Sequence, residues 1–186
     1  MSNPNEEERF NANVKVLTDL VHELCSNCWD AGNKQINPTM ILLAGAYLSS
    51  FDKKELIETF ITHTHEKCWE EIRLQNENFF IEHSDSIFGN LPVGKGNIDA
   101  FKVLFTSLDK NGKSIISTDD KNAIFDIFAS LVKICIKYVH RVRDCYLAED
   151  KTTGKMRPYY RHNLFPEIKV REHAKKWDIE LQIPAV

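Results

Sequence analysis

The chain has 186 residues, of which 42% are hydrophobic and 27% are charged, with only seven glycines and six prolines. This length forms one ordinary domain with a core that requires neither disulfides nor metal, and the composition excludes collagen-like, low-complexity and largely disordered proteins. No apolar run approaches the roughly 20 residues of a membrane span, and residues 1–9 lack the features of a secretory signal. We therefore expect a cytoplasmic protein with no membrane partner.

Charge is unevenly distributed along the chain. Residues 151–186 hold eight Lys and Arg against four Asp and Glu, a net of +4, whereas residues 1–150 have a net of −7. The five cysteines, an odd number without the dense spacing of a secreted scaffold, are expected to be reduced. An acidic body with a basic tail predicts that the tail folds onto its own body or docks on an acidic partner.

The first predicted helix covers residues 3–30. Asn3 and Pro4 form a cap followed by a proline at the first helical position, and acidic residues follow in the first turn. Apolar side chains then recur every three or four residues, at Phe10, Val14, Leu17, Val21, Leu24 and Cys28. This spacing lays one stripe along the helix, which we expect to pack inside its own bundle rather than in an intermolecular coiled coil.

Four further helices are predicted. A cap at Asn37-Pro38 starts a second helix over 37–48, and because residues 39–48 have no polar face we expect it to be central. A long third helix covers 50–83, and a glycine-rich loop follows over 84–96. A short fourth helix covers 98–108, with Phe101, Leu104 and Phe105 inward. Ser117 and Asp120 stand at capping-box spacing and begin a fifth helix, which runs to about 146.

The character of the chain changes after Gly154. Three prolines and alternations such as those over 167–171 predict extended chain, with one helical turn near 173–177. The expected fold is therefore all-α, a single bundle of about five helices over 1–150 followed by an extended basic arm over 151–186.

One combination of residues resembles a zinc site. Cys25 and Cys28 stand three residues apart in the first helix, and His65 and Cys68 do so in the third, which gives a Cys3His set if the two helices are neighbours. Cysteine is also one of the commonest small buried residues, and the usual loop-borne Cys-x2-Cys knuckle is missing. Buried structural cysteines are therefore the preferred interpretation, and no cofactor is predicted.

The arm combines basic and aromatic side chains that are candidate partner contacts: Arg157, Tyr159, Tyr160, Arg161, Lys175, Lys176 and Trp177. Aromatic rings that stack on bases, beside cations that follow phosphates, are typical of single-strand nucleic-acid binders. The same composition suits an arm that buries its aromatic side chains and pairs its charges with the acidic body or with a neighbouring subunit. The −7 charge of the body favours the second interpretation.

Three segments resemble small uncharacterised helical proteins of large nucleocytoplasmic DNA viruses. They are residues 79–92, Phe-Phe-Ile-Glu-His-Ser-Asp-Ser-Ile-Phe-Gly-Asn-Leu-Pro, residues 113–116, Lys-Ser-Ile-Ile, and residues 130–140, which begin Ser-Leu-Val-Lys. The resemblance covers roughly residues 80–140. It implies a viral origin and a virion or host-interaction role, without naming an activity.

No Ser, Cys or Thr stands with His and an acid in a recognisable nucleophile motif. The sequence therefore predicts a non-enzymatic structural or protein-interaction protein, whose arm docks on a partner or a neighbouring subunit, within a viral assembly if the resemblance holds. The alternative is a nucleic-acid-binding protein that uses the arm, with structural zinc.

Overall fold

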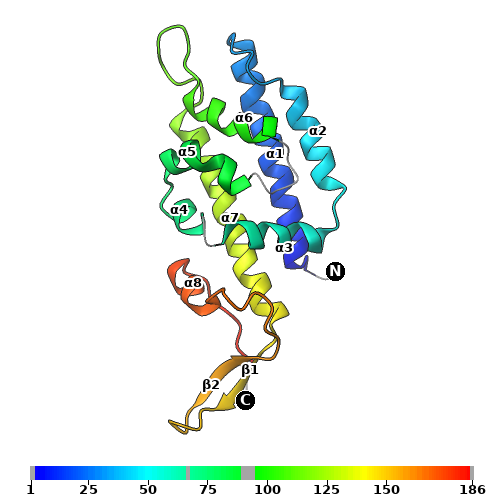
Figure 1. The fold of residues 1–186 in the computed structure, drawn as a ribbon, viewed down its shortest axis with the longest axis vertical. Helices are drawn as coiled ribbons and strands as arrows, with labels where there is room; N and C mark the ends of the chain where they lie inside the picture. The colour runs from blue at the N-terminus through cyan, green and yellow to red at the C-terminus, as the bar shows by residue number, and fades with distance from the viewer. Residues whose placement is uncertain (1–2, 66–67, 89–94, 185–186) are drawn as a thin grey trace. The chain divides into compact units, whose positions relative to one another are not determined.

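The computed structural model describes residues 3–65, 68–88 and 95–184, without the side chains of 85–88, 95–98, 100 and 101 (Figure 1). The described residues are 61% helical and form eight helices and one two-stranded sheet. The prediction of a helix-dominated fold is therefore confirmed. The finer expectation of an all-α bundle of about five helices is wrong, because the chain has more helices and a small sheet.

The chain divides into two compact units, Met1–Leu131 (unit 1) and Val132–Val186 (unit 2). The division falls inside a helix, so the last turns of that helix belong to unit 2. In the described part of the chain, no helix combines the length and apolar character that crossing a membrane requires.

Unit 1 consists of helices, with α1 and α2 packed side by side and antiparallel (Figure 1). The elements are α1 (Glu6–Asp30), α2 (Pro38–Ser49), α3 (Lys53–Thr64), α4 (Trp69–Arg73), α5 (Glu77–Phe88), α6 (Lys95–Thr106) and α7 (Thr118–Val142), whose residues after Leu131 belong to unit 2.

Helix α1 begins two residues later than predicted, because Asn5 rather than Asn3 is the cap. The Asn5 side chain accepts a hydrogen bond from the Glu8 amide at 2.9 Å, and the Glu8 carboxylate accepts one from the Asn5 amide at 3.2 Å. This reciprocal pair satisfies two amides that the helix itself leaves without partners. The predicted stripe is buried at Phe10, Leu17, Val21, Leu24 and Cys28.

The predicted long third helix is wrong, since residues 53–88 form three helices. Gln75 adopts a left-handed backbone with φ of +52°, and the Asn76 side chain accepts a hydrogen bond from the Phe79 amide at 3.2 Å, so a new helix begins there. Between α3 and α4, the indole N–H of Trp69 donates to the hydroxyl of Thr64 at 3.0 Å. Both side chains are buried, so this bond connects the end of α3 with the start of α4.

Helix α2 forms where predicted but is not central. Asn37 caps it by accepting from the Thr39 amide at 3.0 Å, and Pro38 occupies the first turn. Gly45 brings the helix close to α1, since a Cβ there would lie 3.4 Å from Thr18. In the described structure only Ile41 and Leu48 of this helix are buried, and its opposite face remains exposed.

The glycine-rich loop predicted over 84–96 is wrong at both ends, because α5 extends to Phe88 and α6 begins at Lys95. Residues 89–94 lie outside the described chain. Leu104 and Phe105 are buried as predicted. The Phe101 side chain lies outside the described residues. Aromatic contacts connect α5, α6 and α7, with the ring of Phe125 5.5 Å from Phe80 and 6.0 Å from Phe105.

The predicted capping box at the start of α7 is confirmed: the Ser117 hydroxyl accepts from the Asp120 amide at 3.1 Å, and the Asp120 carboxylate accepts from the Ser117 amide at 3.0 Å. The helix ends at Val142, before the predicted 146. Asp144 there has a φ of +52°, a left-handed conformation that stops the helix and starts a strand.

The rest of unit 2 is folded rather than extended. Strands β1 (Cys145–Glu149) and β2 (Met156–Tyr160) form an antiparallel hairpin, and helix α8 (Val170–Lys176) follows. The hairpin loop is closed by the Asp150 carboxylate, which accepts from the Thr152 amide at 2.8 Å, and by Gly154, whose φ is +70°. An extended arm over 151–186 is therefore a wrong prediction, whereas the helical turn predicted near 173–177 is confirmed by α8.

Candidate binding pocket

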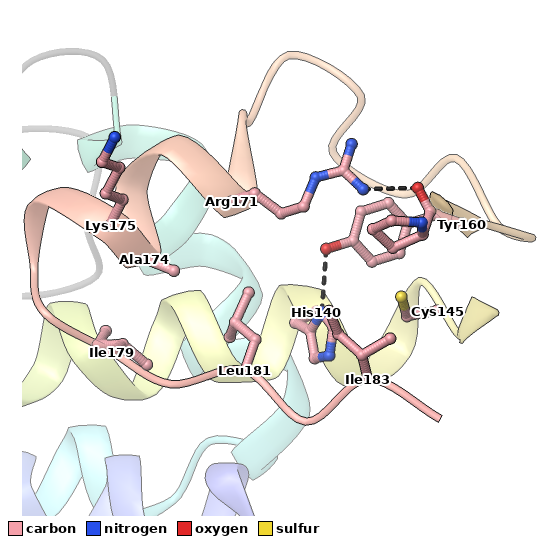
Figure 2. A pocket seen from close by; sticks show the side chains of 10 residues that line it. His140, Cys145, Tyr160, Arg171, Ala174, Lys175, Ile179, Leu181 and Ile183 are labelled. Atoms are coloured by element: carbon pink, nitrogen blue, oxygen red, sulfur yellow. Dashed lines mark hydrogen bonds between the residues drawn. The ribbon is translucent and has the colours of Figure 1, made fainter. Parts of the chain in front are cut away.

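Unit 2 contains a pocket of about 230 Å³ between the end of α7, the hairpin, α8 and the segment that follows α8 (Figure 2). Most of its lining is apolar, with a few polar groups at one end. The lining residues are His140, Cys145, Pro158, Tyr160, Arg171, Ala174, Lys175, Ile179, Leu181 and Ile183.

Two alternating patterns bring these residues together. Cys145 pairs with Tyr160 in the hairpin, so both side chains lie on one face of the two strands, whereas neighbouring Tyr146 and Tyr159 lie on the other. In the segment after α8, every second residue is apolar: Ile179, Leu181 and Ile183 line the pocket, and the residues between them do not. The chain's own final described segment thus forms one wall of the pocket.

A hydrogen-bonded pair forms the polar end of the pocket. Nδ1 of His140 lies 2.9 Å from the hydroxyl of Tyr160, and Nε2 lies 2.8 Å from the backbone carbonyl of Gln182. Because a carbonyl oxygen only accepts, Nε2 carries a hydrogen, and in the neutral ring Nδ1 accepts the hydrogen of the Tyr160 hydroxyl. This pair connects α7, β2 and the final segment.

Two arginines lie over the ring of Tyr160. The Arg143 guanidinium is 4.3 Å from the ring centre and donates to the Ile168 carbonyl at 3.1 Å. Arg171 lies 5.8 Å from the same centre, and its Nη1 donates to the Pro158 carbonyl at 2.6 Å. Cations above an aromatic face are attracted by its electron density, so both arginines are held beside the pocket.

The nucleophilic groups of the pocket are held in their neutral forms. Burial raises the pKa of the Cys145 thiol, and the positive charge of Arg171 opposes this only in part. Burial, assisted by Cys145, also raises the pKa of the Tyr160 hydroxyl. A reactive cysteine requires the opposite shift, so this chemistry suits binding better than nucleophilic attack.

The predicted partner contacts are divided among four places. Tyr160 and Lys175 line the pocket, Trp177 is buried, and Lys176 is exposed outside the pocket. The three others, Arg157, Tyr159 and Arg161, do not line the pocket.

The outer face of the hairpin carries an aromatic pair, Tyr146 and Tyr159, with ring centres 6.1 Å apart. Arg161 stacks 5.2 Å above Tyr146 and forms an ion pair with Asp144 at 3.0 Å. Arg157 forms an ion pair with Asp150 at 3.2 Å. Both arginines of this face are therefore neutralised by a nearby carboxylate.

The pocket residues that the sequence predictions missed are His140, Cys145, Pro158, Arg171, Ala174 and the three apolar residues of the final segment. The alternation Ile179-Glu-Leu181-Gln-Ile183 is a strand-like signal that could have identified that wall. Nothing local in the sequence indicates the pairing of His140 with Tyr160, because the two stand twenty residues apart.

The proposed zinc ligands do not form a metal site. Cys68 donates to the Thr64 carbonyl at 3.4 Å, and Nδ1 of His65 lies 3.0 Å from the Ile61 carbonyl. Among the described residues, no three His, Cys, Asp or Glu side chains are grouped to hold a metal. Burial raises the pKa of Cys28, and burial together with Cys28 raises that of Cys25 to about 12, so both thiols stay protonated near neutral pH in the metal-free protein.

No protein-family model, no curated protein sequence and no solved structure matches this chain. Its function is therefore inferred from its own residues and geometry.

Proposed function

We propose that the protein is a non-enzymatic structural protein that self-associates through the exposed face of α2. The observation that supports this proposal is a group of four large hydrophobic side chains, Met40, Leu42, Leu43 and Tyr47, which are 48%, 52%, 61% and 54% exposed. Single exposed hydrophobic residues are ordinary, but contiguous ones commonly mark a site of association.

These side chains form a continuous surface, which we call the α2 face. Met40, Leu43 and Tyr47 stand at helical spacing along one stripe, and Leu42 lies beside it. The 12-residue helix contains no charged residue. The α2 face is thus uncharged along its whole length.

A second copy of the same chain is the occupant that fits this face best. A two-fold axis places each residue opposite itself or opposite a near neighbour, so a charged face would bring like charges together. The α2 face avoids this repulsion, and an antiparallel pair of α2 helices crossing near Leu43 would bury the exposed stripe of both copies. A charged partner would find no complementary group on α2.

The expected association is weak. A 12-residue helix is about 18 Å long, so its face is smaller than the roughly 800 Å² that each partner contributes to a standard stable interface. A two-fold contact of this kind joins copies in pairs, so the α2 face would supply the dimeric unit of a larger assembly. A viral assembly, the origin that the sequence resemblance implies, is part of the same proposal.

The test measures mass over a series of protein concentrations by sedimentation velocity. Wild-type protein should shift from monomer toward dimer as concentration rises, and Leu43→Glu should remain monomeric, because a dimer would bury two opposed carboxylates. Val16→Glu is the matched control, since Val16 is 53% exposed on α1 and receives the same change outside α2. A wild-type protein that stays monomeric, or a control that acts like Leu43→Glu, would contradict the proposal.

Docking of the 151–186 segment on a protein partner remains a second proposal. It is supported by Tyr159, which is 39% exposed on the outer face of the hairpin. The nucleic-acid alternative is weaker, because the carboxylates of Asp150 and Asp144 already pair with Arg157 and Arg161, the cations that would contact phosphates. Salt-dependent binding of single-stranded probes that is lost in Tyr159→Ala would reverse this ranking.

A further inference from the structure

We propose that the unit 2 pocket binds a small apolar monocarboxylate, such as an aryl or short-chain carboxylic acid or the terminal residue of a peptide. This assignment is separate from self-association through α2. It follows from the size of the pocket, its walls and the single guanidinium at its edge.

The size and walls determine the body of the ligand. An apolar cavity of roughly 150 Å³ holds a benzene molecule. At about 230 Å³, this pocket has room for a phenyl ring or a short alkyl chain together with one carboxylate. Its apolar walls are Pro158, Ala174, Ile179, Leu181 and Ile183, and Cys145, whose pKa is raised by burial, adds a neutral thiol.

Arg171 determines the head group. Its Nη1 is engaged by the Pro158 carbonyl, and within the described chain its Nε–Nη2 edge has no partner. That edge presents two parallel N–H groups, the arrangement that a carboxylate accepts with both oxygens. In Figure 2, Arg171 extends from α8 toward Tyr160, and the ammonium of Lys175 points away from both residues.

The charges around the pocket favour a single negative charge. None of the lining residues is Asp or Glu, and Asp144, next to Cys145, is already paired with Arg161 at 3.0 Å. The Tyr160 hydroxyl donates to His140 in the neutral pair, so its oxygen does not compete for the guanidinium with a negative charge. A doubly charged phosphate would have to be desolvated among these apolar walls. The free-energy cost of this desolvation would exceed the stabilisation that one guanidinium provides.

The test titrates phenylacetate into full-length protein and follows backbone amides and the Arg171 Nε–H group by two-dimensional NMR. Phenylacetamide, which has the same shape without the charge, is the matched ligand. Phenylacetate should cause saturable shifts around Tyr160, Ala174 and Arg171 in the millimolar range, and phenylacetamide should bind about tenfold more weakly or less. Equal affinity for the two ligands, or an absence of saturable shifts, would overturn the proposal.

Variants test the assigned cation. Arg171→Gln should weaken phenylacetate binding by about tenfold or more, and Lys176→Gln, an equal charge change on the exposed side of the same helix, should leave binding unchanged. If the spectrum of Arg171→Gln shows that this variant is not folded, Arg171→Lys is tested instead. Lysine keeps the positive charge but lacks the planar guanidinium, so this variant should bind phenylacetate several-fold more weakly than the wild type. Wild-type affinity in the Arg171 variant, or an equal loss in Lys176→Gln, would contradict the assignment.

A short peptide that ends in phenylalanine, with a free or an amidated terminus, distinguishes the two sources of the carboxylate. Binding of the free peptide and not of the amide supports a chain terminus as the natural ligand. Binding of phenylacetate alone supports a free acid. Equal binding of both peptides would overturn the role of the carboxylate.

Discussion

At the scale of single residues, the buried thiols of α1 illustrate how position determines chemistry. Cys25 and Cys28 are each only 3% exposed, and burial is the main cause of the rise in both pKa values. The Ser107 hydroxyl, hydrogen-bonded to Cys28, opposes the rise there. These cysteines therefore act as small apolar core residues, and the residue pattern that resembled a zinc site is a consequence of helix packing.

This shift predicts a loss of stability in alkaline solution. In the folded protein the pKa of Cys25 is about 12, above its ordinary value of 9.0. A raised folded-state pKa contributes stability below the unfolded pKa and loses it as pH rises, because only the unfolded chain then releases the proton. Between those two values the free energy of unfolding should fall by up to about 1.4 kcal/mol per pH unit from this group.

Urea unfolding at several alkaline pH values checks this expectation. Cys25→Ala is the comparison, since it lacks the thiol and should be less stable near neutral pH because of the cavity it leaves. Its free energy of unfolding should then decline less steeply with pH than that of the wild type. Parallel pH profiles for the two proteins would show that the Cys25 thiol is not protected from ionisation by the fold.

At the scale of elements, the hairpin of unit 2 depends on a glycine that adopts a left-handed backbone. Gly154 has a φ of +70°, and Gly112 has a φ of +76° in a turn of unit 1. Replacement of either glycine by alanine should cost about 1–2 kcal/mol, because a Cβ disfavours this conformation. The space around each Cβ is not limiting, since at Gly154 the nearest contact is Glu149 at 3.8 Å and at Gly112 nothing lies within 4 Å.

The two glycines form a matched pair because alanine would be strained by a similar positive φ at either position. Only Gly154 lies in the hairpin whose strands line the pocket. Gly154→Ala should lower the protection of hairpin amides against hydrogen exchange and weaken phenylacetate binding. Gly112→Ala should lower the stability of its own turn and leave the pocket unaffected. An intact hairpin with unchanged exchange in Gly154→Ala would show that the loop does not determine the strand pairing.

The features that the sequence predicted are local ones. The cap at Asn37-Pro38 and the box of Ser117 with Asp120 depend on residues within one turn, and both form. The break at Gln75-Asn76 was missed because Asn76 stands inside an unbroken helical pattern of apolar residues, where its capping role is not evident. Helix formation can be predicted from such local signals.

The exposure of α2 and the set of residues that line the pocket depend on contacts between residues that are distant in the sequence. Helix α2 has the composition of a central helix, yet its burial is decided by which neighbours pack on it, and α1 covers only one side. In the same way, Tyr160 and Lys175 were predicted as contacts by composition alone, whereas His140 and Arg171 join them only through the fold. A sequence pattern therefore predicted the elements better than the site.

At the scale of the whole molecule, charge separates the two units. Unit 2 has twelve Lys and Arg against seven Asp and Glu, a net of +5, so unit 1 has a net of −8. From opposite charges of this size we propose a second route to self-association, in which unit 2 of one copy meets unit 1 of another. The two routes, α2 on α2 and basic unit on acidic unit, differ in their physical driving force.

Salt distinguishes these routes. At about 0.5 M sodium chloride, interactions between exposed charges are screened within a few ångströms, so association between oppositely charged units should decline. Burial of the uncharged α2 face does not involve charge, and sulfate, which is excluded from protein surfaces, should strengthen it. We therefore expect the dimer fraction of wild-type protein to be unchanged in sodium chloride and increased in sodium sulfate. The same measurement on Leu43→Glu should show monomer in both salts. Dissociation in sodium chloride that does not depend on Leu43 would instead assign the contact to the charged surfaces of the units.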